Sequence, residues 1–242
     1  MIQILSTLYN ASNYIERSVN SLLNQTITDW KCYITDDLST DGTTSYVEAL
    51  IESDNRFELI VNKKKMWQPG NYYQILKKEE IKELDICVTL DMDDWLADNY
   101  VLERITKEYQ DENLWLTYGQ YEQWLGDGQT YKGSCSEPDF NNLRGFNDWT
   151  ISHLRTYRAF LFREIKQEDL IAPSGEYWET AGDISFMLPM IEMAGKKHSK
   201  FLSEINYIYN VQNPLNDFKQ KVSQQLSYRE LIKKKKPYKQ ID

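Results

Sequence analysis

Three aspartates within four positions are the residues of this sequence best suited to bind a metal ion or a polar ligand. Asp91, Asp93 and Asp94 directly follow an apolar run, 86–90, that predicts a short buried strand. Carboxylates are costly to bury without partners, so three at a strand end favour a cation or a polar ligand. Mg²⁺ and Mn²⁺ prefer oxygen ligands and often take only one or two carboxylates, with substrate phosphates completing the shell. Taken alone, the stretch is also compatible with a solvated acidic turn.

The segments around these aspartates predict an α/β fold. Apolar strand segments alternate with segments of helical periodicity along the first hundred residues or so. The expected strands are 2–8, 30–35, 57–61 and 85–90, and the expected helices are 14–23, 44–53 and 71–78. Repeated strand–helix units predict a mostly parallel sheet with helices on both faces. Ligands of such sheets bind at the carboxyl ends of the strands, where the polar clusters at 9, 36–37 and 91–94 fall.

The second half of the chain is less regular. Its expected helices are 99–109, 184–193 and an amphipathic C-terminal helix at about 218–233, and its expected strands are 114–121 and 201–209. Residues 135–147 form a long polar loop, which in a compact domain is usually functional or mobile. We expect His198, in a turn before the last strand, and the lysines of 63–65 to be exposed to solvent.

Composition argues against several classes of protein and site. The 242 residues carry 37 acidic and 28 basic side chains, and a net charge of −9 argues against nucleic acid as a partner. Three scattered cysteines and two histidines argue against a zinc site and favour a reducing, cytoplasmic setting. We expect no signal peptide and no transmembrane segment, because no apolar run approaches roughly 20 residues. The lysines at 233–236 would give at most a weak peripheral contact with an anionic membrane.

Four segments of the chain resemble one known family. They are STLYN at 6–10, LLNQT at 22–26, DDLSTDGT at 36–43 and LDMDDWL at 90–96. Their order and spacing resemble the opening of the family 2 glycosyltransferases, which are nucleotide-sugar-dependent enzymes of the GT-A fold. The resemblance implies one Rossmann-like GT-A domain over 1–242. Within it, 1–98 would bind the nucleotide sugar, 99–217 would bind the acceptor, and 218–242 would form a C-terminal helix and basic tail.

For the nucleotide, the resemblance implies three contacts. Thr7 would touch the nucleotide through its backbone, and Tyr9 would lie near the base. Asp37 would accept a hydrogen bond from a uracil-like N–H, because a carboxylate only accepts. The alternative for Asp37 and the preceding Asp36 is a structural turn closed by their side chains.

For the acidic stretch, the resemblance implies two shared tasks. Asp91 and Asp93 would contact the nucleotide sugar. Asp93 and Asp94 would hold Mn²⁺ or Mg²⁺ across the diphosphate, with Asp94 the first choice as ligand.

For the acceptor side, the resemblance implies a general base. Asp183 would take the proton of the acceptor hydroxyl, opposite the leaving diphosphate, although Gly182 stands where the family has a glutamate. The alternative for Asp183 is a plain helix cap. His153 and Arg155 would contact a phosphate or the acceptor, and their alternative is a surface turn before a helix.

The resemblance therefore implies a metal-dependent, inverting glycosyltransferase. It would move a sugar from a nucleoside diphosphate, with UDP the first choice, to a hydroxyl of a glycan or lipid-linked acceptor. Two other functions stay open. One is a nucleotidyltransferase-like enzyme, although no Gly-rich phosphate loop follows the first strand. The other is a degenerate nucleotide- or sugar-binding module, which Gly182 keeps in consideration.

Overall fold

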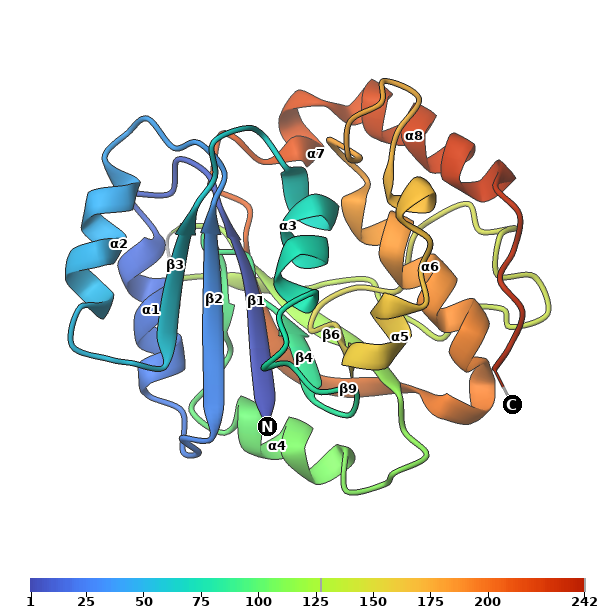
Figure 1. Cartoon of the computed structure of the whole chain (residues 1–242), viewed down its shortest axis with the longest axis horizontal. Helices are drawn as coiled ribbons and strands as arrows, with labels where there is room; N and C mark the ends of the chain where they lie inside the picture. The colour runs from blue at the N-terminus through green and yellow to red at the C-terminus, as the bar shows by residue number, and fades with distance from the viewer. Residues whose placement is uncertain (127, 242) are drawn as a thin grey trace.

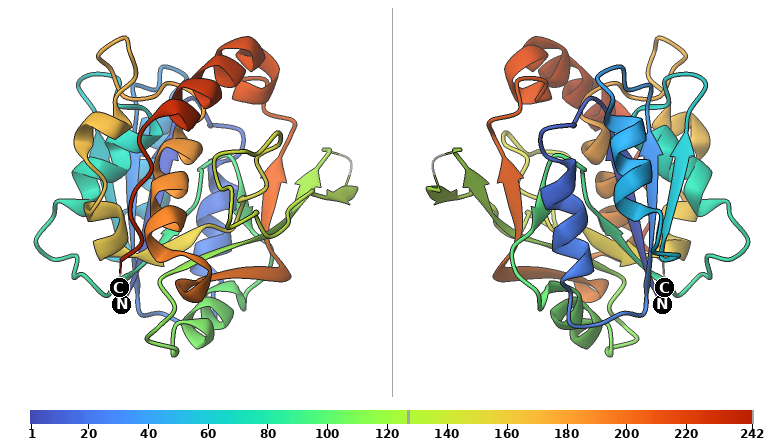
Figure 2. Two further views of the ribbon diagram at one scale, coloured as in Figure 1. Left: turned by 90° about the vertical axis from the view of Figure 1, so that its right-hand side faces the viewer. Right: turned by 90° about the vertical axis from the view of Figure 1, so that its left-hand side faces the viewer.

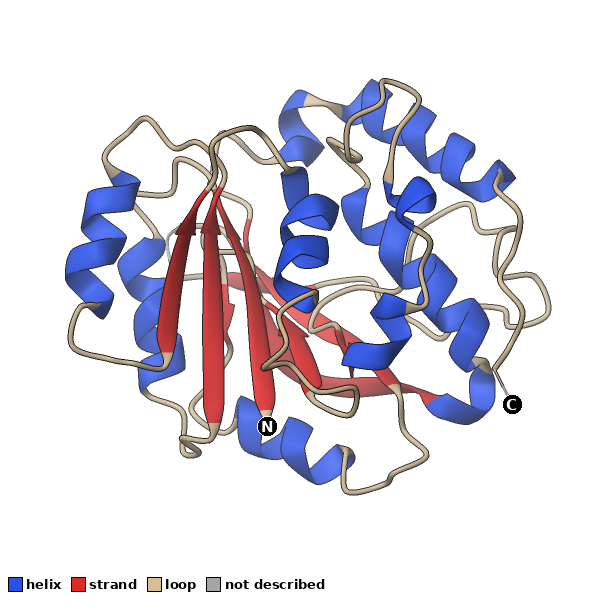
Figure 3. Cartoon of the chain, in the orientation of Figure 1, coloured by secondary structure: helices blue, strands red, loops and turns tan. Residues whose placement is uncertain are grey.

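The computed structural model describes residues 1–126 and 128–241, and the side chains of these except 217 and 218. Helices cover both faces of one central sheet (Figures 1 and 3). The strands are β1 Ile2–Leu8, β2 Trp30–Asp36, β3 Phe57–Val61, β4 Ile86–Thr89, β5 Trp95–Leu96, β6 Leu116–Trp124, β7 Thr130–Lys132, β8 Thr156–Arg158 and β9 Ser199–Asn210. The α-helices are α1 Ile15–Leu23, α2 Thr43–Ile51, α3 Trp67–Leu76, α4 Val101–Glu108, α5 Ala159–Arg163, α6 Gly182–Ala194, α7 Asp217–Gln220 and α8 Val222–Lys234. Two 3₁₀ turns are η1 Gln167–Leu170 and η2 Lys196–His198.

The sheet runs in the order β3-β2-β1-β4-β8-β6-β9-β5, and β7 pairs with β6. Most paired residues belong to the parallel pairs β3/β2, β2/β1, β1/β4 and β6/β9. The antiparallel pairs involve the short strands β5, β7 and β8. The predicted α/β fold with a mostly parallel sheet is therefore confirmed.

Alternation along the strands divides the core between the two faces of the sheet. Ile4 and Ile34 face one side, and their neighbours Leu5 and Tyr33 face the other, as the two-residue period of a strand requires. α1, α2 and α4 cover the first face, whereas α3, α5 and α6 cover the second (Figure 2). α6 is buried almost all round, which explains why its sequence is apolar without a polar stripe.

Strand register brings the carboxyl ends of the parallel strands together. Leu8 of β1 pairs with Asp36 of β2, which pairs with Val61 of β3. The segments that follow these residues therefore leave the sheet at the same edge. The candidate residues after β1, β2 and β4 come together at this edge because of the register.

The expected helices 71–78 and 218–233 differ most from the helices of the structure. α3 begins at Trp67 rather than at residue 71, because the Asp37 carboxylate accepts hydrogen bonds from the backbone N–H groups of Met66 and Trp67. Pro69 is tolerated because it lies in the first turn. The C-terminal helix is two helices, α7 and α8, separated at Lys221, whose ammonium lies 4.5 Å from the centre of the Trp67 ring.

His198 is buried, so the expectation of a solvated side chain is wrong. Its ring stacks on Trp115 with 3.7 Å between the ring centres, and its Nδ1 lies 2.6 Å from the carbonyl oxygen of Asn113. The aromatic partner lies directly before β6, a neighbourhood that sequence spacing alone does not reveal.

Among the described residues, none of the helices combines the length and apolar character that a membrane crossing requires.

Arg144 ties the C-terminal helix to the rest of the domain. Its guanidinium donates two hydrogen bonds to the Glu192 carboxylate of α6, at 2.5 and 2.8 Å. It also donates to the carbonyl oxygens of Ile232 and Lys235, at 2.8 and 2.9 Å. The side chain of Glu192 is only 4% exposed, so this carboxylate depends on Arg144 for compensation.

Replacing Arg144 by alanine should lower the free energy of unfolding by about 3–5 kcal/mol, because it leaves a buried carboxylate without its cation. Urea denaturation measures the loss. The control is Lys200→Ala, which removes a solvent-exposed pair with Glu108 and should cost less than about 1 kcal/mol. Equal losses for the two variants would contradict the structural role of Arg144.

Candidate active site

One cavity of about 660 Å³ opens at the carboxyl edge of the sheet, between the loops after β1, β2 and β4 and the helices α3, α6 and α8. Large cavities with a few convergent polar groups are the usual binding sites of small ligands. All of the candidate residues line it: Thr7, Tyr9, Asp37, Asp91, Asp93, Asp94, His153, Arg155 and Asp183. The fold thus brings together residues that the sequence spreads over some 180 positions.

Asp91 is held by donors from two other segments. Its Oδ1 accepts hydrogen bonds from Thr7 Oγ1 and from Gln68 Nε2, both at 2.9 Å. Thr7 lies next to the last residue of β1, and Gln68 lies in the first turn of α3. Burial raises the pKa of Asp91, although the positive charge of Arg155 opposes the rise.

Asp93 and Asp94 are held by β9 and the loop that follows it. Tyr207 donates its hydroxyl to Asp94 Oδ2 at 2.6 Å, and the backbone N–H of Asn210 donates to Asp94 Oδ1 at 2.7 Å. Asn213 donates to Asp93 Oδ2 at 2.8 Å. Burial raises the pKa of Asp94 well above its ordinary value, and repulsion from Asp93 and Asp91 adds to the rise. Protein donors occupy both oxygens of Asp94, so that its carboxylate also anchors β9.

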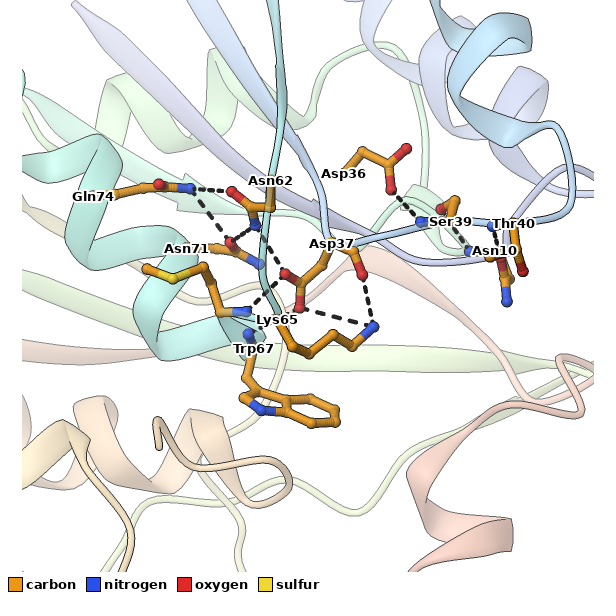
Figure 4. A network of polar contacts seen from close by, with 11 residues as sticks. Asn10, Asp36, Asp37, Ser39, Thr40, Asn62, Lys65, Trp67, Asn71 and Gln74 are labelled. Carbon is orange, nitrogen blue, oxygen red and sulfur yellow. Dashed lines mark hydrogen bonds and ion pairs between the residues drawn. The ribbon is translucent and has the colours of Figure 1, made fainter. Parts of the chain in front are cut away.

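Asp37 organises the loop between β3 and α3 (Figure 4). Its Oδ1 accepts from Asn62 Nδ2 and from the Met66 N–H, both at 2.8 Å, and its Oδ2 accepts from the Trp67 N–H at 2.9 Å. Lys65 donates to the Asp37 carbonyl oxygen at 2.7 Å. Asp37 therefore has a structural task at the start of α3, whatever else it contacts in the cavity.

Two residues beside Asp37 have different surroundings: Asp36 is buried in a turn, and Lys65 lies against an aromatic ring of the cavity. Asp36 is fully buried and accepts from the Ser39 N–H at 2.9 Å and from the Thr44 hydroxyl, so it closes the turn after β2. Lys65 places its ammonium 3.1 Å from the centre of the Tyr9 ring. The expectation that the lysines of 63–65 all face solvent is therefore wrong for Lys65.

His153 and Arg155 are buried, which excludes the alternative of a surface turn. Arg155 Nη2 lies 2.7 Å from Asp183 Oδ2, and Arg155 Nη1 lies 3.2 Å from His153 Nδ1. The His153 ring stacks on Tyr207, with 4.3 Å between ring centres. Burial, and then the charge of Arg155, lower the pKa of His153 well below its ordinary value, so the ring is neutral at pH 7.

Arg155 lies between two acidic groups. Burial alone would lower the pKa of its guanidinium, but the charges of Asp183 and Asp91 outweigh burial and raise it. Arg155 therefore stays charged and links the acidic stretch after β4 to the first turn of α6. Among the described residues, the Asp183 carboxylate accepts hydrogen bonds from Arg155 Nη2 at 2.7 Å and from Trp149 Nε1 at 3.1 Å, and none from the N–H groups of α6.

The family model described as "Glycosyl transferase family 2" matches residues 4–169 of the chain. The chain belongs to glycosyltransferase family 2. Its sheet and helices match the GT-A fold, as solved structures of two such proteins show. TarS of S. aureus is 18% identical with a TM-score of 0.66, and 87% of this chain covers 36% of that one. The mannosyltransferase PcManGT from Pyrobaculum calidifontis, solved with GDP-Man and Mn²⁺, is 16% identical with a TM-score of 0.63, and 98% of this chain covers 65% of that one.

Curated relatives of this family 2 chain include two bacterial enzymes. The chondroitin synthase of Pasteurella multocida is 26% identical over 201 residues, which are 82% of this chain and 20% of the synthase. WfgD of Escherichia coli, named as a UDP-Glc:alpha-D-GlcNAc-diphosphoundecaprenol beta-1,3-glucosyltransferase, is 32% identical over 123 residues, which are 50% of this chain and 46% of WfgD. The match therefore spans about a fifth of the synthase and about half of WfgD.

Some residues of this glycosyltransferase site carry no recognisable signal in the sequence. Gln68, Tyr207, Asn210 and Trp149 donate to the candidate carboxylates, yet they lie far from them in the chain. Trp149 follows the long polar loop of 135–147, whose predicted functional character is the only clue to it. Such donors can be identified only from the tertiary structure, which brings distant segments of the chain together.

Gly182, where the family has a glutamate, lies against the start of α3. A Cβ atom at Gly182 would lie 3.0 Å from Pro69 Cδ and 3.1 Å from Pro69 Cγ. Such contacts are tighter than normal packing allows, so a larger side chain would have to displace Pro69. Pro69 follows Gln68, which bonds Asp91, so the displacement would reach the acidic stretch.

Gly182→Glu should lower the free energy of unfolding by about 1–3 kcal/mol through overpacking against Pro69. Gly182→Ala, which adds one carbon, should cost less, and urea denaturation of both variants measures the series. A Gly182→Glu protein as stable as the parent would show that α3 yields and that the glutamate of the family can be accommodated.

Proposed function

We propose that this chain is an active, metal-dependent and inverting glycosyltransferase that transfers a sugar from UDP to a hydroxyl of a glycan or lipid-linked acceptor. The observation that carries the proposal is the single cavity that holds both the acidic stretch after β4 and the carboxylate of Asp183. An inverting transfer needs these two groups on opposite sides of the reacting sugar carbon. Arg155 lies between them and keeps both carboxylates in one polar network.

The donor half of the proposal rests on the loops after β1, β2 and β3. Tyr9 lines the cavity and is 45% exposed, and because the Lys65 ammonium lies over one face of its ring, a base would stack on the other face. Thr7 lines the cavity beside Asp91. UDP is the first choice because WfgD is named for UDP-Glc and because TarS was solved with UDP and with UDP-GlcNAc.

The residues present fit a divalent metal. Among the described residues, no three His, Cys, Asp or Glu side chains form a preformed metal site. Mg²⁺ and Mn²⁺, however, need only one or two carboxylates when a diphosphate supplies further oxygens. Asp93 and Asp94, with Asp91 beside them, form the crowded carboxylate group of the cavity and would hold the ion. A bound Mn²⁺ or Mg²⁺ would neutralise charge on the departing diphosphate.

The acceptor half rests on Asp183. Its carboxylate would take the proton of the acceptor hydroxyl while that oxygen attacks the anomeric carbon from the face opposite the UDP group. Arg155 orients the carboxylate, and neutral His153 supports the guanidinium.

A cytoplasmic location stays a prediction that agrees with the free thiols of Cys32, Cys87 and Cys135.

Thermal unfolding with UDP, GDP, CMP and dTDP, each with and without Mn²⁺, tests the donor half. UDP should raise the melting temperature in a Mn²⁺-dependent way, because a ligand that binds only the folded protein stabilises it. Asp93→Ala should abolish the Mn²⁺-dependent part, whereas Asp98→Ala, an exposed aspartate paired with Arg104, should leave it unchanged. No shift with any nucleotide in folded protein would contradict the donor site and favour a degenerate module.

Asp183→Asn should lower transfer about 10²–10⁴-fold, the range for loss of a general base, without changing the UDP-dependent thermal shift. The measurement is release of UDP from UDP-glucose and UDP-GlcNAc, with water as the acceptor. Unchanged turnover in Asp183→Asn would assign the base to another residue. Loss of the UDP-dependent shift would instead place Asp183 in donor binding.

A further inference from the structure

Two donors from outside α6 converge on one oxygen of Asp183. Trp149 Nε1 donates to Asp183 Oδ2 at 3.1 Å, and Arg155 Nη2 donates to the same atom at 2.7 Å. We infer that Trp149 is a positioning residue, which works with Arg155 to fix the carboxylate of Asp183 so that Oδ1 faces the acceptor hydroxyl. The inference rests on the proposed role of Asp183 as the base, and it assigns a task to a residue that no sequence motif marks.

The geometry leaves one oxygen of Asp183 available. No hydrogen bond to Oδ1 is formed by the described residues, and the side chain is 20% exposed into the cavity. A carboxylate held by one donor can still rotate about its last torsion, which is broad for aspartate. Two donors on Oδ2 restrict that rotation and determine which oxygen meets a reactant. A base must lie within hydrogen-bond reach of the proton that it removes, so its orientation affects turnover directly.

The indole of Trp149 packs on a residue that the C-terminal helix contacts. Its ring packs on Phe146, with 5.1 Å between ring centres. Lys233 of α8 donates to the Phe146 carbonyl oxygen at 2.9 Å, and its ammonium lies 4.9 Å from the centre of the Phe146 ring. The indole therefore has a packing partner that is independent of its hydrogen bond to Asp183. An indole nitrogen can only donate, so it cannot remove the proton instead of Asp183.

Trp149 and Arg155 differ in what else they support. Arg155 is buried, touches His153 and compensates the charge of Asp91 as well as that of Asp183. Removing it would disturb the whole cavity. Among the described residues, Trp149 makes one polar contact in the site, so Trp149→Phe keeps an aromatic ring and deletes the donating N–H together with part of the indole ring system. The loss of ring volume is therefore controlled by making the same substitution at a tryptophan outside the cavity.

In Trp149→Phe, we expect kcat for release of UDP from UDP-glucose or UDP-GlcNAc to fall about 10- to 100-fold, as for loss of a hydrogen bond to a charged group. The KM for the donor and the UDP-dependent thermal shift should stay within about twofold of the parent. The matched control is Trp30→Phe, which also deletes one indole hydrogen bond, from Nε1 to the Ile27 carbonyl oxygen at 3.1 Å, outside the cavity. Trp30→Phe should keep the parental kcat.

A second measurement does not depend on turnover. The chain has seven tryptophans, and the indole ¹H–¹⁵N signal that disappears in Trp149→Phe identifies Trp149. That signal should move in Asp183→Asn, because the acceptor changes from a charged to a neutral oxygen. An unmoved signal would show that the hydrogen bond does not form and would overturn the inference.

The two proposals fail in different ways. Parental turnover in Asp183→Asn would contradict the role of Asp183 as the general base and with it the proposed function. Loss of turnover in Asp183→Asn with parental kcat in Trp149→Phe would contradict the positioning role alone. A change in KM without a change in kcat would make Trp149 a binding surface, which would also overturn the inference.

Discussion

Carboxylates crowded at one edge of a sheet need hydrogen-bond donors, and this chain takes those donors from distant segments. Each pairing joins an acidic residue to an element elsewhere in the fold. The pairings are Asp94 with Tyr207 and Asn210, Asp37 with 62–67, Asp91 with Thr7 and Gln68, and Asp183 with Arg155 and Trp149. An unpaired buried carboxylate costs more than most packing contacts contribute. The positions of β9, α3 and α6 are therefore coupled to the chemistry of the cavity.

The loops around this edge carry backbone strain that those contacts compensate. Among the residues that the structure describes, four that are not glycine adopt left-handed φ angles, and each lies in a loop at this edge or at the start of a helix beside it. They are Asn10 at 48°, Leu38 at 70°, Trp67 at 54° and Ala181 at 54°. Such conformations persist only where the surroundings enforce them, and they are concentrated at functional sites. At Trp67, the enforcing contact is the hydrogen bond from its N–H to Asp37.

The charge balance of the cavity agrees with the proposed donor. A chain with a net charge of −9 would repel a nucleoside diphosphate unless local cations compensate. Lys65, Arg155 and Arg229 line the cavity among its aspartates. Arg155 is already paired with Asp183, so its positive charge compensates that carboxylate rather than a diphosphate. The proposed divalent ion would supply the remaining positive charge beside the acidic stretch.

The sequence by itself determined the strand–helix order, the parallel first half of the sheet and the position of the acidic stretch after β4, because hydrophobic periodicity and strand-end polarity are local properties. The sequence also identified the candidate residues, from Thr7 to Asp183, that line the cavity, and their roles stay predictions. Only the tertiary structure decided the start of α3 at Trp67, the burial of His153, Arg155 and His198, and the contact of Gly182 with Pro69. It alone revealed Trp149 beside Asp183. These features depend on partners many positions away, and no local pattern records which distant donor reaches a given carboxylate.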